Sequence, residues 1–390
     1  MRIAFNLSLA GWRFHFFLSQ PIIILKVALT KEKRMQTTPQ EVSLNIAPQF
    51  RFDVIDVTKR IAEQLSVDRK KFKKAAYCSF HTTAGYLEQN VCSRLNYRVD
   101  RIKSFISDFQ DLFPFNADYR HDQMDLRTEL TDEQRKVEPK NADSHLTFIG
   151  SGLKNCVTYV NNPDTPVFFI DLDGVHEHGQ RNRQTKVLFY NEEETVYEHK
   201  VSVPFFDNSV DSVKLDDPKL GYLDKLNTLL EKFDIEHGKV DIILDPEEKS
   251  AGLTVNEYET LLMTHDLVEV LKNPLSFSGS LGRFLSGYSP NASSVINSCT
   301  RNDLERMYNE LTDKYDINKS VLEEIFSRFF AFSVDRFFHM KQSASLLVTN
   351  NQKGEPAQVV QGRYQSPILV QWEPAKNQVR NVTLKITRFK

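Results

Sequence analysis

Three histidines lie in short polar segments whose residue types could build one chemical site. His81 follows an apolar run and opens a His-Thr-Thr-Ala-Gly turn, His121 follows an arginine, and His145 ends an Asn-Ala-Asp-Ser-His run. Imidazoles exchange protons near neutral pH and bind metals, and three of them suit zinc, iron or nickel better than magnesium. We hypothesise a metal held by His81, His121 and His145, with Asp143 orienting a ligand. A hydrogen-bonded cluster that only fixes the loops is the alternative.

Residues around these histidines could also bind a phosphate. Two threonine hydroxyls can donate hydrogen bonds, and a glycine lets backbone N–H groups approach an anion. Arginines can clamp a phosphate through two parallel hydrogen bonds. The alternatives are a simple turn with a threonine cap and arginines that are only solvated. The candidate phosphate ligands are Thr82, Thr83, Gly85, Arg120, Arg181 and Arg183.

The elements that must position these residues alternate between helices and strands. The apolar run before His81 predicts a buried strand, and apolar residues at helical spacing predict helices over 57–65 and 92–113, the second ended by Pro114. The charged segment 122–140 is expected to form a solvated loop or helix that covers the site. Further strands are predicted at 50–57, 146–149, 156–160, 167–172 and 186–190, which together indicate an α+β domain.

Four segments together carry a resemblance to a known family. They are His81-Thr82-Thr83-Ala84-Gly85, Arg120-His121, Asn141-Ala142-Asp143-Ser144-His145, and Asp171-Leu172-Asp173-Gly174 with Arg181 and Arg183. This combination, which spans roughly residues 44–204, resembles the YjbQ-like family of secondary thiamine-phosphate synthases. The chain departs from the family pattern by an insertion before Arg181 and by the absence of a Trp-Gln pair.

The resemblance implies a reaction and a set of site residues. The reaction joins hydroxymethylpyrimidine diphosphate to thiazole phosphate and releases pyrophosphate. The resemblance makes His81, His121, His145 and Asp143 the candidate catalytic residues and adds Asn141 to the substrate ligands. The metal would be zinc-like at the histidines, or magnesium with the pyrophosphate, which oxygen ligands favour. No nucleotide cofactor is expected, and the partner would be a small phosphorylated metabolite.

The second half of the sequence repeats the order of the first. A predicted helix over 223–233 and a strand over 240–244 precede Glu248-Lys249-Ser250-Ala251-Gly252, which aligns with His81–Gly85. The segment 362–371 resembles the closing strand of the family. We therefore predict two tandem YjbQ-like domains, each a mainly antiparallel sheet or sandwich packed with helices. The predicted organisation is an extension over 1–40, domains over 41–205 and 206–390, and an insertion at about 273–311.

The repeat leaves two arrangements of the site open. If the site lies between domains, the second copy could contribute Asn256, Glu257, His339 and Gln365 to one composite site. If each domain holds its own site, the second copy is inactive, because Glu248 replaces the histidine of the turn. The competing function is a non-catalytic metal- or phosphometabolite-binding oligomer. A hydrolase ranks last, because no serine or cysteine lies in a nucleophile-like setting.

Composition limits the remaining possibilities. The 390 residues are 40% hydrophobic and 26% charged, and a net charge of −2 provides no general attraction to nucleic acid. Four separated cysteines without a Cys-x-x-Cys pair favour a reducing, cytoplasmic location. Residues 1–34 are apolar but interrupted, so we expect a disordered or mis-started extension rather than a membrane segment. The family resemblance implies a homo-oligomer, in the form of a trimer-like ring.

Overall fold

The chain folds as an α+β protein with several antiparallel sheets. The computed structural model describes residues 38–64, 68–206, 210–272, 342–350 and 356–390, all within one compact unit. The predicted 1–34 extension, the 273–311 insertion and His339 lie outside the described residues. Within the described ranges, no helix is both long and apolar enough to cross a membrane.

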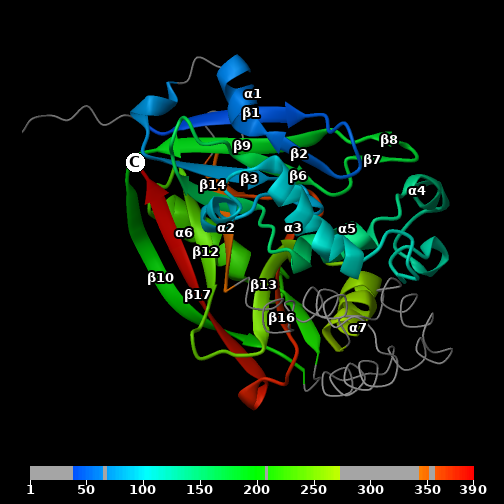
Figure 1. Cartoon of the computed structure of the whole chain (residues 1–390). Coiled ribbons are helices and arrows are strands. Elements are labelled where there is room, and N and C mark those ends of the chain that lie inside the picture. The colour runs from blue at the N-terminus through cyan, green and yellow to red at the C-terminus, as the bar shows by residue number, and fades with distance from the viewer. Residues whose placement is uncertain (1–37, 65–67, 207–209, 273–341, 351–355) are drawn as a thin grey trace, which may run out of the picture. The chain divides into compact units, whose positions relative to one another are not determined.

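The described first half contains two main sheets packed with helices, and a separate two-stranded sheet formed by β7 and β8 (Figure 1). One sheet has the strand order β1-β9-β3-β5 and the other has the order β2-β6-β4, with antiparallel pairing throughout. The core between them is apolar and includes Tyr77, Tyr86 and Phe169. The elements are β1 (Gln40–Ile46), β2 (Asp53–Asp56), α1 (Val57–Gln64), β3 (Lys74–Ser79), β4 (Ala84–Gly85), α2 (Gln89–Arg94), α3 (Val99–Leu112), α4 (Asp132–Val137), α5 (Ala142–Gly150), β5 (Cys156–Val160), β6 (Phe168–Asp171), β7 (Val175–His176), β8 (Gly179–Gln180) and β9 (Arg183–Tyr190).

The second half repeats this strand order. Its sheets run β10-β17-β12-β14-β15 and β11-β16-β13, and long β10 lies beside β17 (Figure 1). This half begins with β10 at Glu193, before the predicted division after residue 205. The elements are β10 (Glu193–Pro204), β11 (Asp211–Lys214), α6 (Tyr222–Lys232), β12 (Gly238–Leu244), β13 (Ala251–Asn256), α7 (Leu267–Lys272), β14 (Ser343–Thr349), β15 (Gln358–Val360), β16 (Ser366–Gln371) and β17 (Val379–Phe389).

The strand registers match between the halves residue by residue. Ala84 pairs with Asp171 in the first half, and Ala251 pairs with Gln371 in the second. Arg183 and Arg380 occupy equivalent places on β9 and β17, opposite Ile46 and Val203 respectively. The alignment of the 248–252 segment with the His81 turn therefore agrees with the hydrogen-bonded ladders.

Two sequence predictions about helices and strands are wrong. The 146–149 segment, predicted as a strand, lies inside helix α5, whose side chains are almost all buried. Because α5 is covered on all sides, its apolar run carries no helical period that could identify it. The single helix predicted over 92–113 is two helices, because Asn96 and Tyr97 adopt left-handed backbone conformations between α2 and α3.

Candidate functional site

The His121 segment of the first half is held by carboxylates of the second half. His121 Nδ1 lies 2.9 Å from Glu259 Oε2, and this pair is almost completely buried. Asp266, in the π-helical turn before α7, accepts hydrogen bonds from the backbone N–H groups of Arg120 and His121, each at 2.9 Å. The second half therefore fixes both the backbone and the ring of this histidine.

Hydrogen bonding assigns a positive charge to His121. The amide Nδ2 of Asn141 donates to Asp173, so its Oδ1 faces His121 Nε2 at 3.3 Å. An N–H on Nε2, together with the N–H that points to Glu259, makes the ring an imidazolium. Burial opposes this charge, but the bond to Glu259 and the negative charges of Glu257 and Glu259 together outweigh it and raise the pKa of His121. Burial also acts against Glu259, yet His121 and two backbone N–H groups lower the pKa of that carboxyl to about 2.

His145, on α5, is held by Asn256 at the end of β13. The Asn256 amide donates to the backbone carbonyl of Thr82, so its Oδ1 faces His145 Nδ1 at 2.7 Å. Nδ1 therefore carries the proton, and Nε2 keeps a lone pair. Burial is the main cause that lowers the pKa of His145 to about 3, and the neighbouring His121 adds to it. The two rings stand edge to face with centroids 5.3 Å apart.

Glu257 lies beside the free nitrogen of His145. Its Oε2 is 3.6 Å from His145 Nε2, and its Oε1 is 3.6 Å from the guanidinium of Arg127. Arg127 is only 2% exposed, and it also pairs with Glu129 and Glu138. This arginine belongs to the segment predicted to be solvated, and the three carboxylates explain how its charge is buried. Burial raises the pKa of Glu257.

His81 has a different environment from the other two histidines. Its Nε2 accepts a hydrogen bond from the backbone N–H of Gln184 at 2.7 Å. Burial, with the positive charges of Arg183 and Arg181, lowers the pKa of His81 to about 3. Gln365 of the second half donates to the backbone carbonyls of Ser79 and His81, at 3.0 and 2.9 Å. His81 is thus a neutral ring whose turn is fixed from both halves.

The predicted metal site does not fit this arrangement. The His81 Nε2 lone pair is already used by a backbone N–H, and His121 carries protons on both nitrogens. Across the described ranges, no group of three or more His, Cys, Asp or Glu side chains is arranged to hold a metal ion. Of the three histidines, only His145 has a nitrogen free to accept a ligand.

Arginines and carboxylates form a second network next to His81. Arg183 makes two 2.7 Å hydrogen bonds to Asp171 and a third, of 3.1 Å, to Thr83 Oγ1. All three groups are buried, so the hydrogen bonds of Arg183 stabilise the fold and are not available to a ligand.

Arg181 and Arg51 are more exposed than Arg183 and therefore more accessible to a ligand. Both pair with Asp173, Arg181 at 2.5 Å and Arg51 at 3.3 Å, and their side chains are 30% and 26% exposed. Arg181 Nε is buried and has no partner in the described part of the chain. Arg51 also bonds Asp143 at 2.7 Å, although burial raises the pKa of Asp143 to about 6. These two arginines present the positive charge that an anion could reach.

The remaining predicted residues have structural contacts of their own. A Cβ on Gly85 would lie 2.5 Å from the backbone oxygen of Lys154, so close strand packing requires this glycine. The Arg120 guanidinium lies 3.2 Å from His265 Nδ1. Sequence reasoning missed Glu259 and Asp266, which are isolated acidic residues after the Asn256-Glu257 pair and carry no pattern that would mark them.

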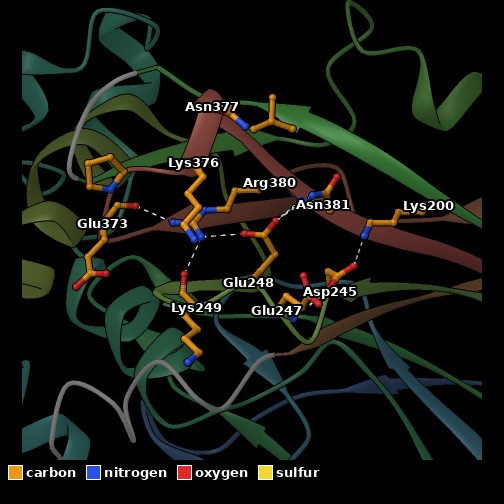
Figure 2. Close-up of a pocket in the computed structure, with 12 residues that line it drawn as sticks. Lys200, Asp245, Glu247, Glu248, Lys249, Glu373, Lys376, Asn377, Arg380 and Asn381 are labelled. Atoms are coloured by element: carbon orange, nitrogen blue, oxygen red, sulfur yellow. Dashed lines mark hydrogen bonds and ion pairs between the residues drawn. The ribbon is translucent and has the colours of Figure 1, made fainter.

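The second half carries a cavity at the place equivalent to the His81 turn. Its volume is about 690 Å³, and Figure 2 shows Arg380 at its centre. Glu248 accepts from the backbone N–H of Asn381 at 2.8 Å, as His81 does from Gln184. The lining residues are Lys200, Asp245, Glu247, Glu248, Lys249, Glu373, Pro374, Lys376, Asn377, Val379, Arg380 and Asn381.

The carboxylate that pairs with the arginine has changed position between the halves. Arg183 pairs with Asp171, whereas Arg380 Nε bonds the neutral Gln371, equivalent to Asp171, at 3.3 Å. Arg380 takes its carboxylate from Glu248 instead, at 2.9 Å (Figure 2). At this equivalent position each half therefore buries an arginine against one carboxylate, but the carboxylate comes from a different element.

No family model and no curated protein matches the chain. Solved structures similar to it include a YbjQ-like protein of unknown function from Sulfolobus solfataricus, 15% identical with a TM-score of 0.25, covering 50% of this chain and 99% of that one. A hypothetical protein from Aeropyrum pernix is 14% identical with a TM-score of 0.23, covering 48% of this chain and 96% of that one. An uncharacterized conserved protein of the yjbq family from Clostridium acetobutylicum is 13% identical with a TM-score of 0.21, covering 49% of this chain and 99% of that one. Each spans about half of this chain, and similarity at this level assigns no activity.

Proposed function

We propose that the chain is a tandem duplication of one α+β module and binds a small phosphorylated metabolite in a site completed by both modules. The observation that carries the proposal is the origin of the contacts. The segments that contain His81, His121 and His145 each form a hydrogen bond with a second-half side chain, Gln365, Glu259 and Asn256 respectively. The matching strand registers of the two halves support the duplication.

The arginines beside the His81 turn support an anionic ligand. Arg51 and Arg181 share Asp173, and Arg181 retains an unpartnered Nε in the described structure. Both guanidiniums are partly exposed, so a phosphate could form charge-assisted hydrogen bonds with them. Arg183 would act indirectly, by holding Asp171 and Thr83 in place.

The reaction that we propose to assay first is the one implied by the family resemblance, thiamine phosphate formation with release of pyrophosphate. The guanidiniums of Arg51 and Arg181 would stabilise the negative charge that develops on the departing pyrophosphate. The buried histidines and carboxylates would surround the organic part of the substrate and exclude water. No step is assigned to a metal, because the three histidines do not present a common ligand set. Binding without turnover is the competing function.

The test compares three variants of the full chain by isothermal titration with pyrophosphate. We expect Arg181→Ala and Asn256→Ala each to weaken binding at least tenfold, since one removes a ligand and the other releases the Thr82 and His145 contacts. Arg98→Ala is the control, because its exposed ion pair with Asp100 lies outside the site. Unchanged binding in Arg181→Ala would refute the anion site. Pyrophosphate binding without thiamine phosphate formation would leave the binding function and exclude the synthase.

A further inference from the structure

Two hydrogen-bond acceptors, His145 Nε2 and the Glu257 carboxylate, lie side by side, and no donor from the described residues lies between them. Asn256 holds the proton of His145 on Nδ1, so Nε2 is an acceptor. Glu257 Oε2 lies 3.6 Å from it, beyond hydrogen-bond distance. His145 is 1% exposed, and its Nε2 has no hydrogen-bond partner within the described ranges. A buried acceptor without a donor is unfavourable, so this arrangement favours a ligand that supplies one.

The surroundings fix these acceptors and leave one side open. Arg127 is buried and forms an ion pair with the other oxygen of Glu257 at 3.6 Å, and the Asn256 amide donates to the carbonyl of Thr82. Glu257 is 20% exposed, so a ligand can reach the pair from its side. Both acceptors are therefore positioned before a ligand arrives, which lowers the cost of binding.

We propose that His145 Nε2 and the Glu257 carboxylate form a subsite for an amino group of the ligand. An amino group carries two N–H donors on one nitrogen and can satisfy both acceptors, whereas a hydroxyl offers one donor. This proposal rests on the proposed function and extends it, because it specifies the group at the non-phosphate end. Asn141 connects the two ends, as it contacts His121 on one side and Asp173, the partner of Arg181, on the other.

The test uses two probes of nearly equal shape, 4-amino-2-methylpyrimidine and 2,4-dimethylpyrimidine, titrated into the full chain. The amino probe should bind at least tenfold more tightly, because only it can donate to both acceptors. Glu257→Gln should remove this preference. The matched control is Glu138→Gln, which also takes a carboxylate from Arg127 but does not face His145. In nitrogen-15 spectra of labelled histidine, the amino probe should shift His145 Nε2 in the wild type.

Several outcomes would overturn the subsite. These are equal affinity for the two probes, no binding of either, a preference that survives in Glu257→Gln, or a metal ion found on His145 Nε2. The result is separate from the phosphate test. If pyrophosphate binds as expected but the amino preference is absent, the subsite fails and the proposed function stands. If the preference is present but pyrophosphate does not bind, the phosphate assignment fails.

Discussion

Replacing Glu248 with histidine would give the second half the residue that the first half has at the equivalent position. The ring could still accept the N–H of Asn381, as His81 accepts that of Gln184. Arg380, however, would lose its carboxylate, and its remaining partners among the described residues are neutral. The Glu248→His variant therefore tests how far stability depends on pairing this buried guanidinium.

The expected loss in free energy of unfolding follows from the burial of the Arg380–Glu248 ion pair. The side chains of Arg380 and Glu248 are 6% and 14% exposed, so solvent screens their ion pair poorly. Removing one partner of a buried pair costs ~3–5 kcal/mol, and the remaining hydrogen bonds of Arg380 place this case near ~3 kcal/mol. Adding Gln371→Asp would restore a carboxylate where Asp171 serves Arg183. The double variant should therefore lie within ~1 kcal/mol of wild type. With Gln371→Asp alone close to neutral, this is a coupling of about 2 kcal/mol.

Urea unfolding of the wild type, both single variants and the double variant measures this coupling. The control is Glu194→His, which removes a carboxylate from the more exposed Arg388 on the same strand and should have a much smaller effect. A double variant as unstable as the sum of the singles would refute the reasoning. In that case the equivalence of Gln371 with Asp171 would not extend from backbone register to side-chain geometry.

Two further predictions concern the contacts between the halves. The lowered pKa of Glu259 stabilises the fold above its ordinary value of 4.5, and the raised pKa of His121 does so below 6.5. Glu259→Gln should therefore be most destabilising between these values, and an equal deficit in urea unfolding at pH 3, 5.5 and 8 would contradict this. Gly362→Ala would place a Cβ 1.9 Å from the Phe80 carbonyl oxygen, so we expect a loss above ~2 kcal/mol. Gly221→Ala, left-handed but in open space, should cost only ~1 kcal/mol, and equal urea midpoints would argue against the Gly362 contact.

Local sequence patterns predicted those elements whose surroundings differ from one side to the other. The strand over 156–160 has its predicted bounds in β5, and the amphipathic helix over 223–233 is α6, shifted by one residue. Helix α5 was missed because burial on every side removes its period. Its start depends on a distant residue, Asp122, which accepts the backbone N–H groups of Asn141 and Ala142.

The candidate site was predictable in its first-half motifs and only in part in its second-half partners. His121 and Glu259 are 138 residues apart in the chain, and no spacing rule connects them. Arg127 was expected in solvent because charge runs are usually exposed, and only the folded chain shows three carboxylates around it. Asn256 and Glu257 were proposed as possible contributions of the second half, and the structure places both beside His145.

The two halves share the order and register of their strands, but their surfaces differ. This difference explains why second-half side chains contact the His81 turn of the first half. On β3, Ala76 and Cys78 are buried against Leu347 and Phe389 of the second half. The β12 position equivalent to Ala76 is Asp241, which bonds Ser345 and pairs with Lys239. The first half thus has an apolar face where the equivalent second-half face is mixed, with Asp241 and Lys239 beside the apolar Leu347 and Phe389, so the contact joins unlike surfaces. Through this contact, the second-half side chain of Gln365 reaches the His81 turn. The equivalent Glu248 turn lines the cavity of the second half instead (Figure 2).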